Sequence, residues 1–349
     1  MPRPREVLGV TCRCAALVLL AALGTSALAQ DRPGEWPCYG RDAGGTRYSP
    51  LAQIDRTNVQ RLKVAWTYRT GELDRIHSRS LLNKATFEAT PLAIDGVLYF
   101  STPTARVIAL KADTGAELWT YDAELDQKLV FAEGASRGVS YWRSNDKPAE
   151  RRLFFGTLDA RCIAIDADSG RPCTDFGQDG AIDLAADLPR ATRGLYAVTS
   201  PPAVVGDVVI VGSAIADNGR FDASPGVVRA FDARTGKLVW SWDPIPRKVS
   251  DPGYETWKGE KALKTGAANV WSIISVDAER GLVFLPTTCP SPDYYGGERL
   301  GDNLFANSAV ALEAKSGKML WHFQVVRHDI WDYDIAAQPV LFSLERDNT

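Results

Sequence analysis

One pattern, repeated four times, limits most strongly what this chain can fold into. Each copy is an alternating apolar run, a turn in which Ser or Thr precedes Gly, and a second run that usually carries Trp. The copies occupy residues 107–121, 162–176, 227–242 and 309–323. Two such runs around a tight turn predict a β-hairpin, because Gly supplies the positive φ that the turn requires.

Further strands are predicted before each hairpin. Apolar runs lie at residues 96–102, 152–158, 207–213 and 281–287, and shorter runs such as "FEATPLAI" and "TSPPAVV" come before most of them. Four strands per repeat, with Trp on the outermost, predict an all-β fold: a β-propeller of four-stranded blades with tryptophan-docking-type repeats. The connections lack amphipathic helical patterns of about 10 to 15 residues, which excludes an α/β fold.

The connections predict where a functional site lies. Extra length enters almost wholly between the second and third strands of a repeat, or before the first strand. Antiparallel alternation places both kinds of connection on one face of a propeller, where repeat proteins usually build their sites. The acidic stretch "RHDIWDYD" (327–334) is such a connection, because the run after it repeats the pattern of an innermost strand.

Residues 1–29 have the features of a secretory signal peptide. Arg3 and Arg5 precede an apolar run, and "ALA" stands before Gln30. The apolar run is shorter than the roughly 20 residues that a membrane-spanning helix needs. We therefore expect residues 30–349 to be exported to the periplasm, where the protein is either free or membrane-associated.

Four cysteines remain after the expected cleavage, in an oxidising compartment. Cys162 and Cys173 flank a predicted hairpin turn and could face each other across it. This favours a structural disulfide over two free thiols.

Polar and aromatic residues collect on the insertion-bearing face. They include Arg137, Asp217 with Asn218, Trp271, Asp293, Asp302 and the acids of residues 327–334. Each has a structural alternative: Arg137 could form an ion pair, Asp217-Asn218 a turn, and Trp271 part of the core. Their convergence on one face instead suits a planar, anionic cofactor with a hard cation.

Several other functions are excluded. The sequence has no Walker loop, no GxGxxG after a strand and no GxSxG elbow, so nucleotide, nicotinamide and serine-hydrolase chemistry are not expected. The net charge of −3 gives no reason to expect nucleic acid as a partner.

Taken together, several stretches resemble the pyrroloquinoline-quinone (PQQ) dehydrogenases, particularly the periplasmic part of membrane-type quinoprotein glucose dehydrogenases. They include "WPCYGRDAGGTRYSPLAQI" (36–54), "SRGVSYW" (136–142), "SPDYYGGERLGDN" (291–303) and "HDIWDYDIAAQP" (328–339). Members of that family close an eight-bladed propeller, so residues 30–349 would be a partial domain of about half that size.

The resemblance implies roles for eight residues. Five would contact the quinone through polar groups, hydrogen bonds or stacking: Glu88, Arg137, Thr157, Ser200 and Trp271. Asp217 and Asn218 would bind Ca²⁺ or Mg²⁺, which polarises a quinone carbonyl. Asp329 would be the general base, while Asp332 and Asp334 are expected to be structural.

The implied activity is oxidation of a glucose-type sugar or an alcohol by hydride transfer to PQQ, with an external quinone or cytochrome as electron acceptor. Two alternatives stay open. One is a non-catalytic propeller that serves as a protein-binding scaffold; the other is an inactive, truncated dehydrogenase.

Overall fold

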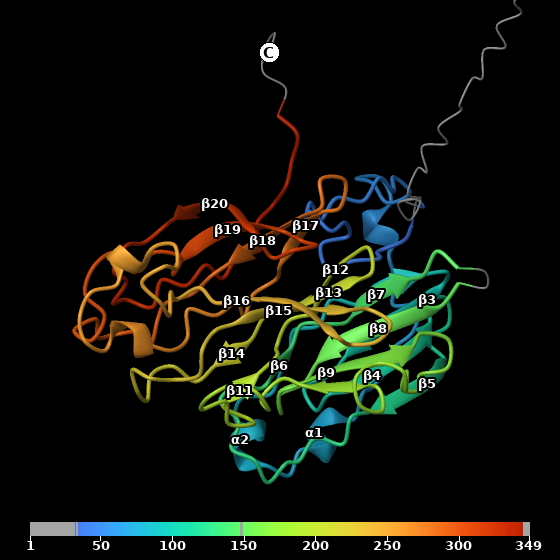
Figure 1. The fold of residues 1–349 in the computed structure, drawn as a ribbon. Coiled ribbons are helices and arrows are strands. Elements are labelled where there is room, and N and C mark those ends of the chain that lie inside the picture. The colour runs from blue at the N-terminus through green and yellow to red at the C-terminus, as the bar shows by residue number, and fades with distance from the viewer. Residues whose placement is uncertain (1–31, 33, 147–148, 345–349) are drawn as a thin grey trace, which may run out of the picture. The chain divides into compact units, whose positions relative to one another are not determined.

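The computed structural model describes residues 32, 34–146 and 149–344. All of the sheets belong to the unit of residues 33–349. The described residues contain four antiparallel sheets of four strands, each in the predicted strand order or its reverse (Figure 1). The prediction of four-stranded blades is confirmed. The predicted signal peptide lies outside the described residues.

The strands of the four sheets have the following bounds. The first sheet has β2 (Leu92–Ile94), β3 (Val97–Ser101), β4 (Arg106–Lys111) and β5 (Glu117–Asp122). The second has β7 (Ser140–Arg143), β8 (Arg151–Gly156), β9 (Arg161–Asp166) and β10 (Ala181–Asp183). The third has β12 (Ala203–Val205), β13 (Val208–Val211), β15 (Val228–Asp232) and β16 (Leu238–Trp242). The fourth has β17 (Ser275–Asp277), β18 (Leu282–Pro286), β19 (Ser308–Glu313) and β20 (Met319–Gln324).

Short elements occupy the connections. Two small sheets pair β1 (Thr86–Phe87) with β6 (Ala135–Ser136) and β11 (Tyr196–Ala197) with β14 (Ala214–Ile215). The helices are α1 (Glu72–Arg75), α2 (Arg79–Leu82) and the 3₁₀ turns η1 (Val59–Arg61), η2 (Tyr254–Thr256) and η3 (Ala262–Lys264). In the described part of the chain, no helix is long and apolar enough to span a bilayer.

The four predicted hairpin turns are confirmed. Their glycines have nearly identical positive φ values of 70°, 69°, 68° and 70° at Gly115, Gly170, Gly236 and Gly317. Three of these turns also receive an indole from an earlier part of the chain. The indoles of Trp66, Trp119 and Trp240 donate to the carbonyls of Ala112, Ala167 and Ala314. A Cβ on the facing glycine would lie 2.5 to 2.6 Å from the ring, so only Gly allows this contact.

The joint between the second and third sheets is built differently. A Cβ at Gly236 would meet the backbone of Gly177 rather than an indole. Instead, the ring of Trp142 in β7 contacts the guanidinium groups of Arg152 and Arg234, whose Cζ atoms are 5.6 and 5.1 Å from the ring centroid. Arg152 donates to the carbonyl of Arg234 at 2.7 Å. The Trp142 indole also donates to the carbonyl of Gly206 at 3.0 Å, in the turn between β12 and β13. Cation–π contacts and charged hydrogen bonds therefore reinforce this joint, where no indole docks at the hairpin glycine.

The core lies between successive sheets. Phe154 of β8 packs toward the third sheet, while its neighbours Leu153 and Phe155 pack toward the first. Val209 and Ile210 of β13 divide in the same way between the second and fourth sheets. Because alternate residues of a strand face opposite sides, a sheet covered on both faces needs apolar residues at nearly every position.

The expected disulfide is not present, and Cys162 and Cys173 are free thiols. Ile182 of β10 stands opposite Cys162, and the N–H of Cys173 bonds to the carbonyl of Ala164 at 3.0 Å. The outer strand thus begins later than the predicted hairpin implied. This register places Cys173 beside Ala164 instead of across from Cys162.

Candidate functional site

Backbone and hydroxyl hydrogen bonds tie together the connections that lead into β7, β12 and β17, and join the last of them to residues 334–339, which follow β20 and form no strand. The N–H of Arg137 donates to the carbonyl of Thr199 at 2.8 Å. The hydroxyl of Ser200 donates to the carbonyl of Trp271 at 2.5 Å, and that of Ser272 to the carbonyl of Ala336 at 2.6 Å. Polar residues that lie far apart in the sequence therefore meet on one face, as the repeat predicts.

Trp271 is the centre of this arrangement. Its indole Nε1 donates to a carboxylate oxygen of Asp334 at 2.6 Å. The Cζ atom of Arg137 lies 4.9 Å from the ring centroid, within cation–π range. An aromatic plate flanked by a cation and a carboxylate can bind a planar, charged ligand.

Glu88 and Arg137 are also brought together. Glu88 Oε2 lies 3.0 Å from Arg137 Nη2, and Thr86 donates its hydroxyl to the other oxygen at 2.9 Å. The Nη1 nitrogen of Arg137 is buried without a hydrogen-bond partner in the described residues. A buried, unpaired guanidinium nitrogen costs free energy, so an anionic acceptor at this point would stabilise the site.

Thr157 does not join this group directly. Its side chain is buried in the β8–β9 turn, where the hydroxyl donates to Asp159 and accepts the N–H of Arg161. Thr102 makes the same bond to the N–H of Arg106 in the first sheet. The threonine is therefore part of the repeated turn.

Carboxylates from two long loops converge near Trp271. The side chains of Asp217 and Asn218 lie close enough to Asp293 to interact with it electrostatically. Burial, together with the charges of Asp293 and Asp334, raises the pKa of Asp217 above its usual range. Burial and neighbouring acids likewise raise the pKa of Asp293 and of Asp334. These carboxylates therefore retain protons more readily than ordinary surface acids.

The oxygen donors suit a hard cation. Across residues 34–146 and 149–344, no three His, Cys, Asp or Glu side chains are arranged to hold a metal ion. However, Ca²⁺ and Mg²⁺ also take amide and carbonyl oxygens, and Asn218 adds such a donor to the Asp217–Asp293 pair. Asp293 Oδ1 is buried without a hydrogen-bond partner in this part of the chain. An unpaired, buried carboxylate oxygen between like charges fits a divalent cation.

Asp329 has a structural role in this loop. It is 1% exposed, and its Oδ1 accepts the N–H of Trp331 at 3.0 Å. Its Oδ2 accepts the N–H of Tyr333 at 2.7 Å and the amide of Asn307 at 2.9 Å. Because both oxygens serve the loop, the carboxylate has little capacity left to accept a substrate proton.

Asp332, unlike Asp329, is exposed and has a carboxylate oxygen available to accept a proton. It is exposed, and Oδ2 accepts the phenol of Tyr294 at 3.0 Å. Within the described residues, Oδ1 accepts no hydrogen bond. Its φ of +61° lies in the left-handed region, which Asp adopts more readily than most residues other than Gly.

Arg299 and Cys289 join the two loops behind the carboxylates. Arg299 is fully buried and donates to the carbonyl of Asp329 at 2.6 Å. The backbone N–H of Cys289 donates to Asp334 at 2.7 Å. Burial raises the pKa of the Cys289 thiol, which therefore stays protonated and is a poor ligand for a hard cation.

Sequence reasoning missed part of this site. Arg299 was not singled out, and nothing in the sequence distinguishes it from a surface arginine. Asp334 was expected to be structural, although its place directly before an innermost-strand pattern matches that of Arg137 and Trp271. That shared position is the signal that could have found it.

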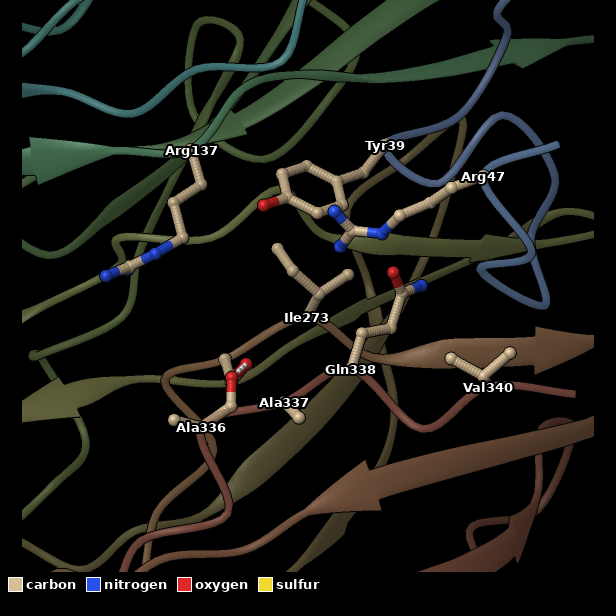
Figure 2. A pocket seen from close by; sticks show the side chains of 9 residues that line it. Tyr39, Arg47, Arg137, Ile273, Ala336, Ala337, Gln338 and Val340 are labelled. Atoms are coloured by element: carbon tan, nitrogen blue, oxygen red, sulfur yellow. Dashed lines mark hydrogen bonds between the residues drawn. The ribbon is translucent and has the colours of Figure 1, made fainter. Parts of the chain in front are cut away.

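A cavity of about 300 Å³ adjoins Arg137 along the innermost strands. Figure 2 shows Tyr39 and Arg47, from the N-terminal segment, opposite Ile273, Ala336 and Gln338. The site therefore combines a hollow, a basic wall and an adjacent carboxylate cluster.

Face-to-face four-stranded sheets, docked indoles and a polar site on the connections of one face define a tryptophan-docking β-propeller. Residues 36–349 match the family model described as "PQQ: Glucose/ethanol/alcohol dehydrogenase, beta-propeller domain". The chain belongs to this family, as the sequence resemblance indicated.

Known relatives agree with this membership. Quinoprotein glucose dehydrogenase A of Acinetobacter calcoaceticus is 35% identical over 337 residues, which are 91% of this chain and 41% of the relative. Quinoprotein glucose dehydrogenase of Escherichia coli (strain K12) is 36% identical, with 88% and 39% covered. Quinohemoprotein alcohol dehydrogenase from Comamonas testosteroni superposes with a TM-score of 0.73 at 30% identity, covering 89% of this chain and 44% of that structure. The chain thus spans about two fifths of these relatives' length.

Proposed function

We propose that this chain acts in the PQQ-dependent oxidation of a glucose-type sugar or an alcohol. The observation that carries the proposal is the convergence on Trp271 of Arg137, Ser200 and Asp334, which come from three other segments of the chain. A propeller used only as a scaffold has no need for a half-buried cation and an acid beside one aromatic ring.

Two residues would contact the quinone directly, and Glu88, Ser200 and Thr157 would support them. Trp271 offers its ring, and Arg137, held by Glu88, offers a guanidinium to carboxylates. Ser200 would fix the Trp271 backbone through its hydroxyl bond. Thr157 would act through its turn, since its carbonyl accepts the N–H of Val198 beside Thr199.

Asp217 and Asn218 would hold Ca²⁺ or Mg²⁺, with Asp293 as an additional ligand. When bound, PQQ would supply a two-electron acceptor for the substrate hydride, and the cation would supply Lewis acidity. The chain's own part is to orient these groups and to move one proton. Electrons would then pass to an external quinone or cytochrome.

The proton acceptor requires a choice between two acids of one loop. The resemblance points to Asp329, but its oxygens already accept three hydrogen bonds from the loop. We assign the role to Asp332, which is exposed and has an oxygen available for a substrate hydroxyl. Asp329 would then hold the loop that presents Asp332.

The test is titration of the purified chain with PQQ, with and without Ca²⁺, followed by tryptophan fluorescence. Saturable, Ca²⁺-dependent quenching is expected, because Trp271 would contact the quinone. Dye-linked oxidation of aldoses and alcohols would then define the substrate. Absence of saturable PQQ binding would contradict the proposal.

Export to the periplasm is a separate proposal, which N-terminal sequencing of the mature protein would check.

A further inference from the structure

The N-terminal segment of residues 36–47 crosses the innermost strands of the sheets. Trp36 exchanges two backbone hydrogen bonds with Ala93 of β2, at 2.8 and 3.0 Å. The carbonyl of Ala43 accepts the N–H of Val276 in β17 at 2.8 Å. Between these points the segment lines a second, smaller hollow with residues of β7 and β12. It is therefore tied to the first and fourth sheets and passes over the two between them.

The segment also closes against the run that follows Asp334. The N–H of Leu341 donates to the carbonyl of Gly44 at 2.9 Å. A Cβ at Gly45 would lie 2.6 Å from the side chain of Gln338, and its φ is +78°. This close approach requires Gly, so Gly45 allows the segment to pack directly against Gln338.

Arg47 brings a positive charge to the cavity that adjoins Arg137. Its Cζ atom lies 5.0 Å from the ring centroid of Tyr39, and Figure 2 shows both side chains at the hollow. The described lining contains two arginines and no Asp or Glu. Within the described residues, no carboxylate lies within ion-pair distance of Arg47.

Arg137 adds a second positive charge to the same cavity, and that charge is only partly neutralised. Glu88 pairs with its Nη2, whereas Nη1 is buried and has no partner in the described residues. Among the described residues, Glu88 forms the one ion pair with these two guanidinium groups, and it pairs with Arg137 alone. A hollow of about 300 Å³ with this imbalance favours a small anion or the anionic edge of a larger ligand.

We propose that Arg47 is a ligand-binding residue and that the N-terminal segment completes the cofactor site from its axial side. Arg47 and Arg137 would bind carboxylate groups of a planar polycarboxylate from the same cavity. The inference rests on the proposed function, because that function identifies PQQ as the polycarboxylate. It adds a binding residue from a segment outside the four blades.

The variant Arg47→Gln tests this, with Arg61→Gln as a control for loss of one positive charge. Arg61 is exposed in η1 and does not line the cavity. PQQ titrations at low and high salt should show about tenfold weaker binding by R47Q at low salt, since charged hydrogen bonds contribute strongly. R61Q should bind as the unaltered chain does. Equal affinities for R47Q and R61Q would overturn the inference while leaving the proposed function intact.

A second measurement separates the two hypotheses if the unaltered chain does not bind PQQ. Citrate, a small tricarboxylate, should raise the melting temperature of the unaltered chain and of R61Q more than that of R47Q. This result would support an anion site at Arg47 although the proposed function had failed. Equal citrate effects in all three proteins would overturn the anion site as well.

Discussion

The indole Nε1 of Trp271 and a carboxylate oxygen of Asp334 are 2.6 Å apart, in a hydrogen bond that spans 63 positions of the sequence. The bond fixes the plane of the ring and occupies one oxygen of an acid whose pKa burial has already raised. The aromatic plate and the carboxylate cluster are therefore mechanically linked, and a change at one should affect the other.

Substitution of Trp271 should separate these two effects. Trp271→Phe retains a ring but removes the N–H donor, so cation affinity should fall several-fold while PQQ affinity changes less. Trp271→Ala should weaken PQQ binding at least about tenfold, because stacking is also lost. Equilibrium dialysis with Ca²⁺ and PQQ measures both affinities. Trp331→Phe, at a ring that is 67% exposed, is the control and should change neither.

Substitutions of Asp329 and Asp332 should have opposite signatures. Asp332→Asn should lower turnover by about 10²-fold or more and leave the free energy of unfolding nearly unchanged. Asp329→Asn weakens the buried bonds to Trp331 and Tyr333, so it should destabilise the chain by about 1 to 2 kcal/mol. Urea denaturation and dye-linked turnover distinguish the two acids. A stable D329N protein without turnover, beside an active D332N protein, would restore Asp329 as the base.

Docked indoles should make some turn glycines far less replaceable than others. Gly170→Ala places a Cβ 2.6 Å from Trp119 at a φ of +69°, whereas Gly281→Ala has a φ of +66° and open space. The control should cost about 1 kcal/mol through backbone strain alone. G170A should cost a further 1 to 3 kcal/mol, roughly, through overpacking. Equal free energies of unfolding for the two variants would show that the docked ring yields easily.

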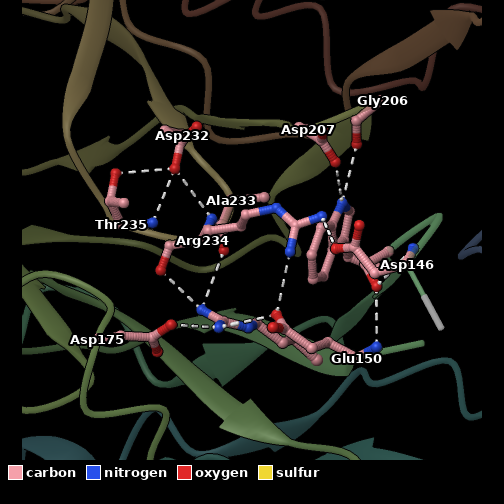
Figure 3. Close-up of polar contacts among 12 residues, drawn as sticks. Asp146, Glu150, Asp175, Gly206, Asp207, Asp232, Ala233, Arg234 and Thr235 are labelled. Atoms are coloured by element: carbon pink, nitrogen blue, oxygen red, sulfur yellow. Dashed lines mark hydrogen bonds and ion pairs between the residues drawn. The ribbon is translucent and has the colours of Figure 1, made fainter. Parts of the chain in front are cut away.

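The joint between the second and third sheets depends on Arg152, whose side chain is 5% exposed. Arg152 pairs with Glu150 and Asp175, and Glu150 also pairs with Arg234. Figure 3 shows Glu150, Asp175 and Arg234 in this group. Arg152→Met should destabilise the chain by about 2 kcal/mol, chiefly through lost hydrogen bonds to backbone carbonyls. Arg143→Gln, at an exposed position of β7, should change stability by less than about 0.5 kcal/mol. Urea denaturation measures both, and a neutral R152M would contradict the assigned role.

The carboxylate cluster predicts how stability depends on pH. Raised pKa values of Asp217 and Asp293 mean that the folded chain holds protons more tightly than the unfolded chain. Without metal, the contribution of these two carboxyl groups to the free energy of unfolding should therefore be largest below about pH 4 and should fall as the pH rises. Ca²⁺ should offset the loss, so its effect on the melting temperature should grow with pH. Asp217→Asn should flatten both trends; a Ca²⁺ effect independent of pH would contradict this account.

The hairpins were predictable because their signals are local. Gly115, Gly170, Gly236 and Gly317 have the φ that their turns require. The outer strand of the second sheet was misplaced because its hairpin continues through a bridge between Ile165 and Pro172 before β10 begins. No local sequence pattern predicts this extension of the hairpin before β10.

The site could be predicted in outline only. Repeat alignment and family resemblance identified Glu88, Arg137 and Trp271, which the structure brings together. Spacing could not tell Asp329 from Asp332, because the distinction depends on which carboxylate the loop's own N–H groups occupy. Contacts across loops, such as that between Arg299 and Asp329, leave no trace in a single sequence.

The docked indoles all point in one direction along the chain, from an earlier segment to a later turn. Trp119 of the first sheet inserts at the turn of the second, and Trp240 of the third inserts at the turn of the fourth. At these two joints each donor is therefore translated before its acceptor, and the later sheet supplies the turn that receives the earlier ring. Because the first repeat carries both an acceptor turn and a donor ring, duplication of the corresponding gene segment would create a new joint whose two halves already match.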